Sequence, residues 1–135
     1  MAEVKVVLLG TAQDGGVPQA GCAKSCCMTE FGGPTRHRNP VALGLTAEDG
    51  SRHLIEASRT LADQLIIWST VDGEPLNKLD SIWLTHGHLG HIDGLGLFGC
   101  EAWGTEDIPL HASESMIGVV QSSPPLAPLF DNNHL

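Results

Sequence analysis

The chain has 135 residues, with 41% hydrophobic and 17% charged side chains and a formal net charge of −9. These values fit one globular domain with a real core. The sequence has no run of basic residues, so its charge argues against a nucleic-acid partner.

No apolar run approaches the ~20 residues that a membrane span needs. The first five residues, Met1 to Lys5, lack the basic start and apolar centre of a signal peptide. We therefore expect a cytoplasmic protein without a membrane segment. In such a compartment, four cysteines indicate metal binding or free thiols rather than disulfides.

Strands and helices alternate along the chain. Apolar, β-branched runs predict strands, and apolar residues at helical spacing predict helices. We expect strands over 4–10, 41–46, 52–57, 79–84 and 108–112, of which those over 41–46 and 52–57 form a hairpin. We expect a helix capped by Ser58, a helix or turn over 94–99, and a helix capped by Ser113 over 114–121. The remaining segments are predicted loops over 11–19 and 29–40, a turn over 70–78, and a Pro- and Asn-rich loop over 122–135. The predicted apolar faces of the two long helices are Leu61, Leu65, Ile66 and Trp68, and Met116, Val119 and Val120. This order predicts a layered α/β fold.

Three of the seven histidines lie within six positions, in the stretch Leu84–Gly94. A predicted strand ends just before them, so the histidines lie on a strand-to-helix loop, where active-site residues often collect. Neutral imidazole is the commonest metal ligand in proteins. His86 and His88 can converge on one ion, and His91 can reach the same ion or a second one about 3.5–4 Å away.

A cysteine cluster forms the second candidate site. Cys22, Cys26 and Cys27 could supply three of the four ligands of a structural zinc ion. His37 or Cys100 could be the fourth ligand. The alternative is a pair of buried thiols that bind nothing.

The motif T-H-x-H-x-x-H resembles the H-x-H-x-D-H signature of the metallo-β-lactamase superfamily, with Gly90 at the position of the aspartate. The loop Gly15–Gln19, followed closely by the cysteines, is similar to the branch that contains pyrroloquinoline-quinone biosynthesis protein B and its relatives. The resemblance implies a layered αββα sandwich, with the cysteines helping to hold a structural zinc ion. Residues 1–135 would form its N-terminal half, because the superfamily takes further ligands from a second half. We therefore expect the chain to be a fragment of a longer protein.

Glycine has no side chain that could bind the second ion of dinuclear members, so the resemblance also puts that ion in doubt. Asp93, three positions after Gly90, is a candidate replacement, although it could instead cap the following helix.

The favoured function is that of a metal-dependent hydrolase acting on a small molecule, with zinc held by His86, His88 and His91. The ion would activate a water molecule, which Asp93 or Asp14 would orient. The first alternative, implied by the resemblance, is an iron-dependent hydroxylase of cofactor biosynthesis. The second is a non-catalytic zinc-binding module. A half-domain would expose apolar surface, so a homo-oligomer is also expected.

Overall fold

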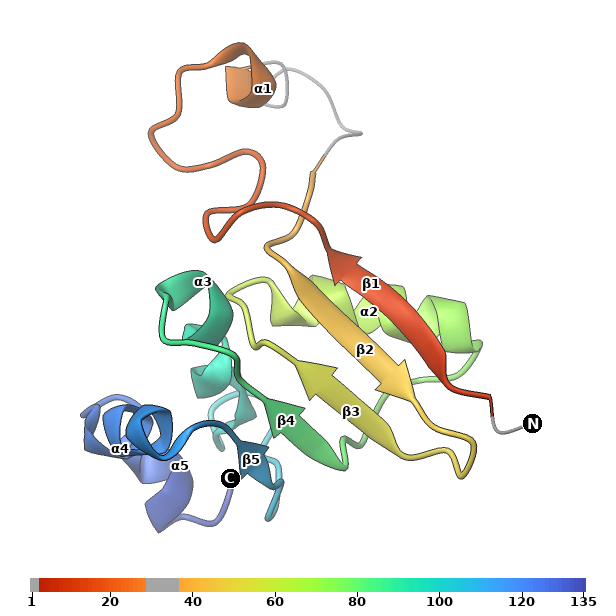
Figure 1. The fold of residues 1–135 in the computed structure, drawn as a ribbon, viewed down its shortest axis with the longest axis vertical. Coiled ribbons are helices and arrows are strands. Elements are labelled where there is room, and N and C mark those ends of the chain that lie inside the picture. The colour runs from red at the N-terminus through yellow and green to blue at the C-terminus, as the bar shows by residue number, and fades with distance from the viewer. Residues whose placement is uncertain (1–2, 29–36) are drawn as a thin grey trace.

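The computed structural model describes residues 3–28 and 37–135. Within them, five strands form one mixed sheet in the order β1-β2-β3-β4-β5 (Figure 1). β1, β2 and β3 pair antiparallel, and β3, β4 and β5 pair parallel. The strands are β1 Lys5–Gly10, β2 Ala42–Thr46, β3 Arg52–Ile55, β4 Ser81–Trp83 and β5 Leu110–His111.

The described helices are α1 Ser25–Met28, α2 Leu61–Asp72, α3 Leu89–Ile92, the 3-10 helix η1 Leu95–Phe98, α4 Glu114–Ser122 and α5 Ala127–Asp131. In Figure 1, α2 lies behind the sheet, α4 and α5 lie beside β5, and α1 sits on a loop that projects beyond the end of the sheet. In the part of the chain that the structure covers, no helix combines the length and the apolar character needed to cross a bilayer.

One face of the sheet carries the core. Side chains alternate along β1, so that Val7 and Leu9 are buried while Val6 and Leu8 remain more than half exposed. The buried side chains pack against α2, η1, α4 and α5 in one continuous cluster. The predicted layered α/β fold is therefore confirmed, as one sheet with helices packed on one of its faces.

The chain connects the strands as the pattern predicts. The hairpin between β2 and β3 turns at Asp49 and Gly50, where the Gly50 N–H bonds to the Ala47 carbonyl at 2.9 Å. From β3 the chain crosses over through α2 to the parallel strand β4, as a parallel connection requires. Ser113 caps α4, because its hydroxyl accepts a hydrogen bond from the Met116 N–H at 3.3 Å.

The start of α2 and its buried face differ from the prediction. Thr60, not Ser58, is the N-terminal cap of α2, and Ser58 instead donates to Gln64 at 2.9 Å. Gln64 is fully buried because its amide also donates to the Pro40 carbonyl, whereas Ile66 is 64% exposed. The prediction of Ile66 in the apolar face was therefore wrong.

Three other expectations need correction. Val119 is 56% exposed, so the buried side of α4 is Met116 and Val120. The predicted turn over 70–78 begins late, since α2 continues to Asp72 and ends at Gly73. The predicted loop over 122–135 contains α5. Pro128 lies in the first turn of this helix, where a backbone N–H would have no partner within the helix, so proline is tolerated there. Residues 29–36 of the predicted polar loop lie outside the described residues.

Candidate metal centre

Three imidazole rings meet where β4 ends and α3 begins. His88 is the N-terminal cap of α3, and His91 lies within this helix. The ring centroid of His86 lies 4.6 Å from that of His88 and 4.0 Å from that of His91. His91 is buried, whereas His86 and His88 are exposed. The structure thus brings together the three histidines that the sequence singled out, with one ring inside and two at the surface.

Glu56 joins this cluster from the end of β3. Its carboxylate accepts a hydrogen bond from the Thr85 N–H through Oε1, and Oε2 lies 3.3 Å from His91 Nδ1. Each of Glu56, His86 and His91 offers a ligand atom within 4.8 Å of the other two. Two histidines and a carboxylate so arranged suit zinc or non-haem iron.

The backbone of Glu56 is strained. Its φ is 69°, a left-handed value that a residue other than glycine seldom adopts. The backbone on both sides is fixed, because the Glu56 N–H bonds to the Trp83 carbonyl and the Ala57 N–H to the His91 carbonyl. Such strain concentrates at functional sites, where the surroundings hold the residue in place. These backbone hydrogen bonds keep the buried carboxylate beside His91.

The outer histidines also have partners. The Thr85 hydroxyl lies 2.8 Å from His86 Nδ1, so Nε2 is the ring nitrogen left for a ligand. Asp14, on the loop after β1, faces the other two rings. Its Oδ2 lies 3.4 Å from His88 Nδ1, and its Oδ1 lies 3.3 Å from His91 Nε2.

Asp93 pairs with an arginine. Its Oδ2 lies 2.7 Å from the Arg59 Nε, which makes a partly exposed ion pair. The residue ends α3 rather than beginning the next helix. Of the two carboxylates that the sequence proposed for the site, the structure places Asp14 against the histidines and Asp93 against an arginine.

The three clustered cysteines also converge. The ligand atoms of Cys22, Cys26 and Cys27 lie within 4.8 Å of one another. Cys27 is 2% exposed, and the Gln19 N–H points to its sulfur at 3.4 Å. A backbone N–H directed at a ligand atom is a common feature of the surroundings of metal sites.

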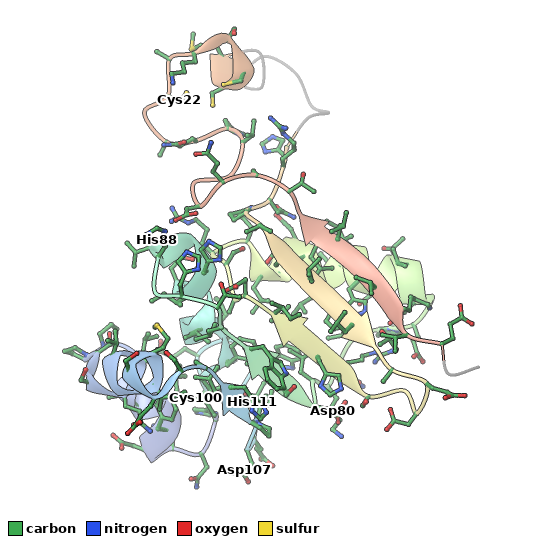
Figure 2. All side chains as sticks on the ribbon, viewed as in Figure 1. Cys22, Asp80, His88, Cys100, Asp107 and His111 are labelled. Carbon is green, nitrogen blue, oxygen red and sulfur yellow. The ribbon has the colours of Figure 1, made fainter. Side chains whose placement is uncertain are left out.

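Neither candidate for the fourth ligand joins the cysteines among the residues that the structure describes. Cys100 follows η1, at the opposite end of the molecule from Cys22 (Figure 2). His37 is exposed and belongs to no grouping of metal ligands in the described ranges. The cluster therefore supplies three ligands.

No model of a known protein family matches the chain. In sequence, the coenzyme PQQ synthesis protein B of Rhodopseudomonas palustris strain TIE-1 is 36% identical over 98 residues, which cover 68% of this chain and 31% of that protein. An octanoyltransferase of Porphyromonas gingivalis is 27% identical over 120 residues, which cover 87% of this chain and 22% of that protein. The chain thus spans less than a third of the length of these two curated relatives.

Two solved structures share the fold. Zn²⁺-bound PqqB from Methylobacterium extorquens matches with a TM-score of 0.76 and 22% identity, over 98% of this chain and 44% of that one. A diphosphatase of the PhnP family matches with a TM-score of 0.66 and 28% identity, over 90% of this chain and 46% of that one. Both belong to the metallo-β-lactamase superfamily. The chain resembles PqqB in sequence and in fold.

The likeness to PqqB covers nearly the whole chain, whereas the chain covers under half of the PqqB structure. The predicted recognition of this branch and the predicted sandwich fold are therefore confirmed, with the described sheet and its helices matching part of the larger PqqB fold. The PqqB structure itself holds Zn²⁺.

Glu56 is the site residue that sequence reasoning missed. It follows directly on the apolar strand residues Leu54 and Ile55. An acidic residue at the end of a buried strand, beside a strand that ends in histidines, is a signal that could have found it. Its contact with His91 depends on the pairing of β3 with β4, which the sequence alone does not give.

Proposed function

We propose that the chain forms the metal-binding part of a metal-dependent hydrolase, with the ion held by His86, His88 and His91. The observation that carries this proposal is the meeting of the three imidazole rings, with the ring centroid of His86 4.6 Å from that of His88 and 4.0 Å from that of His91. This donor set is the kind that zinc takes in catalytic sites, which keep a position open for water.

The buried atoms of the site fit an ion. Glu56 Oε2 and His91 Nδ1 are buried, face each other at 3.3 Å and lack a well-aligned hydrogen bond. Buried polar atoms of this kind are costly unless they are paired. A cation beside them would offset this cost, and a carboxylate behind a metal-binding histidine is a common arrangement.

The residues have distinct tasks in this proposal. The Thr85 hydroxyl contacts Nδ1 of His86, and Glu56 faces Nδ1 of His91, so in both rings Nε2 is the nitrogen left for an ion. An ion held by these residues would supply a water molecule with a pKa lowered toward about 7. Asp14, whose side chain is 46% exposed, faces the histidines from the open side and orients that water. We assign no task to Asp93, whose Oδ2 pairs with Arg59.

The structural neighbour supports a choice of the first substrates to test. The PhnP-family protein is a diphosphatase, so phosphate esters are the first small molecules to test. The cytoplasmic location and the homo-oligomer stay predictions from the sequence.

The test combines metal content with turnover. We expect purified wild type to contain one metal equivalent at the histidines and another at the cysteines, and to hydrolyse bis(4-nitrophenyl) phosphate. His86→Ala/His88→Ala should lose one equivalent and the hydrolysis. His111→Ala is the matched control, because His111 stacks on Trp83 away from the cluster. A double variant that keeps both equivalents would refute the proposal.

The second candidate function is the oxidative one. Two histidines and one carboxylate are also the ligand set of non-haem iron oxygenases, and the sequence relatives are named for PQQ synthesis. Wild type loaded with Fe²⁺ or with Zn²⁺ separates the two functions. Oxygen consumption that depends on Fe²⁺, without ester hydrolysis in the Zn²⁺ form, favours the oxygenase. Zinc at the cysteines alone, with neither activity, favours the non-catalytic module.

A further inference from the structure

Gly90 has no room for a side chain. It is buried in α3, and a Cβ built there would lie 2.3 Å from Asp14 Cα and 2.7 Å from the Asp14 carbonyl oxygen. The obstacle is backbone, which cannot rotate away as a flexible side chain can. The loop after β1 therefore occupies the space where a side chain at position 90 would be.

The Asp14 carboxylate lies beside both neighbouring histidines. Its two oxygens are 3.3 Å from His91 Nε2 and 3.4 Å from His88 Nδ1. A good N–H to oxygen hydrogen bond is shorter, about 2.7–3.2 Å. Two donors on one tetrahedral zinc ion, each about 2.1 Å from the metal, stand roughly 3.4 Å apart. The spacing therefore fits ligands around an ion better than it fits direct hydrogen bonds.

Backbone hydrogen bonds hold the loop on both sides of Asp14. The N–H groups of Thr11 and Ala12 both donate to the Asn39 carbonyl, at 3.1 and 3.0 Å. Beyond Asp14, the Gly16 N–H bonds to the Gln13 carbonyl at 2.8 Å, and Val17 pairs with Arg38. A carboxylate held by such a loop is positioned before an ion arrives, which lowers the entropic cost of binding.

We propose that Asp14 is a metal ligand of the histidine site, and that it supplies from a different segment the carboxylate that Gly90 cannot supply. The position of the Asp14 carboxylate then depends on Gly90, because the loop reaches the histidines only where position 90 has no side chain. This inference rests on the proposed metal site and adds a ligand to it, and this role replaces the water-orienting task given to Asp14 under the proposed function.

The first test is Asp14→Asn, which keeps the shape of the side chain and removes its charge. Zn²⁺ affinity is measured by competition with a chromogenic chelator, and Co²⁺ absorption reports the ligand set. We expect Asp14→Asn to bind Zn²⁺ at the histidines at least ~10-fold more weakly, with an altered Co²⁺ spectrum, and to keep the equivalent at the cysteines. Asp63→Asn, on the exposed surface of α2, is the control for loss of one charge and should match wild type.

The second test is Gly90→Ala. One methyl group there should push the Asp14 loop away and weaken Zn²⁺ binding about as much as Asp14→Asn does. Gly96→Ala is the matched control, because a Cβ at Gly96 meets nothing within 4 Å.

The outcomes separate the two proposals. If wild type binds Zn²⁺ at the histidines and Asp14→Asn has the same affinity and Co²⁺ spectrum, Asp14 is not a ligand, while the metal site stands. If wild type takes up no metal that His86→Ala/His88→Ala removes, the proposed function and this inference both fail.

Discussion

The indole of Trp68 lies against the bare backbone of Gly44, with three ring atoms 2.5–2.7 Å from the point where a Cβ would stand. Trp68 is fully buried, and its Nε1 donates to the Thr46 hydroxyl at 3.1 Å. Glycine in the middle of β2 therefore allows α2 to approach the sheet closely.

Gly44→Ala should lower the free energy of unfolding by about 1–3 kcal/mol, because the added methyl group overlaps the ring of a well-packed side chain. Urea denaturation measures this loss. Gly118→Ala in α4 is the control, since a Cβ there meets nothing within 4 Å and alanine favours a helix. Equal stability of the two variants would show that α2 can shift freely on the sheet.

Glu56→Gln should weaken Zn²⁺ binding at the histidines about 10–100-fold, because an uncharged amide supports His91 and a cation less well than a carboxylate. The amide oxygen can still accept from the Thr85 N–H, so the melting temperature of the metal-free protein should change little. Chelator competition and thermal unfolding measure the two effects. Glu48→Gln, at the exposed hairpin turn, should bind as wild type does. A loss of stability without a loss of affinity would make Glu56 purely structural.

The cysteine cluster predicts a pattern of thiol reactivity. All four cysteines are free of disulfides. Without metal, a thiol reagent should titrate four thiols under denaturing conditions, whereas the native zinc-bound protein should expose Cys100 alone. Cys26→Ser should lose the protection of Cys22, and Cys100→Ser should keep its zinc content. Four fast-reacting thiols in a native protein that contains zinc would place that zinc elsewhere.

Asp72 predicts how stability responds to acid. Its side chain is 3% exposed, and this burial raises its pKa, but hydrogen bonds from Lys5 and Thr46, with the charges of Lys5 and Arg52, outweigh burial and lower the pKa below 3.8. A carboxylate with a lowered pKa in the folded state stabilises the fold above the unfolded-state pKa. This stabilisation is lost as the pH falls through the folded-state pKa.

The free energy of unfolding should therefore fall below about pH 4. Asp72→Asn should be less stable than wild type at pH 6 and should lose less stability between pH 5 and pH 3. Urea titrations at each pH measure the difference, with Asp63→Asn expected to follow wild type. Parallel pH curves for Asp72→Asn and wild type would show that this carboxylate does not contribute to acid sensitivity.

Local patterns were enough to predict much of the fold. The β-branched run over 4–10 and the Asp-Gly turn predicted β1 and the β2–β3 hairpin, because a strand's periodicity and a turn's preference lie within a few residues. The prediction for α5 failed, since the prolines before and within it were taken as signs of a loop, although proline is well tolerated in the first turn.

One part of the candidate site could likewise be predicted from local sequence, and the other part could not. The histidines lie close together in the sequence, so their spacing alone predicted their convergence. The contacts of Glu56 and Asp14 arise from strand pairing and from the fit of a loop on Gly90, which no local window contains. Asp93 seemed the natural replacement carboxylate because it is near in sequence, yet in the structure it pairs with Arg59.

The residues around the histidines come from three segments that are distant along the chain, since 42 positions separate Asp14 from Glu56 and 30 separate Glu56 from His86. Only the native topology brings these segments together, so the unfolded chain holds no comparable site. Under the proposed function, an ion bound there closes two long loops at once, and the free energy of binding adds to that of folding. The apparent stability of the domain would then depend on metal concentration. A bound ion would stabilise the folded state in addition to its proposed role in catalysis.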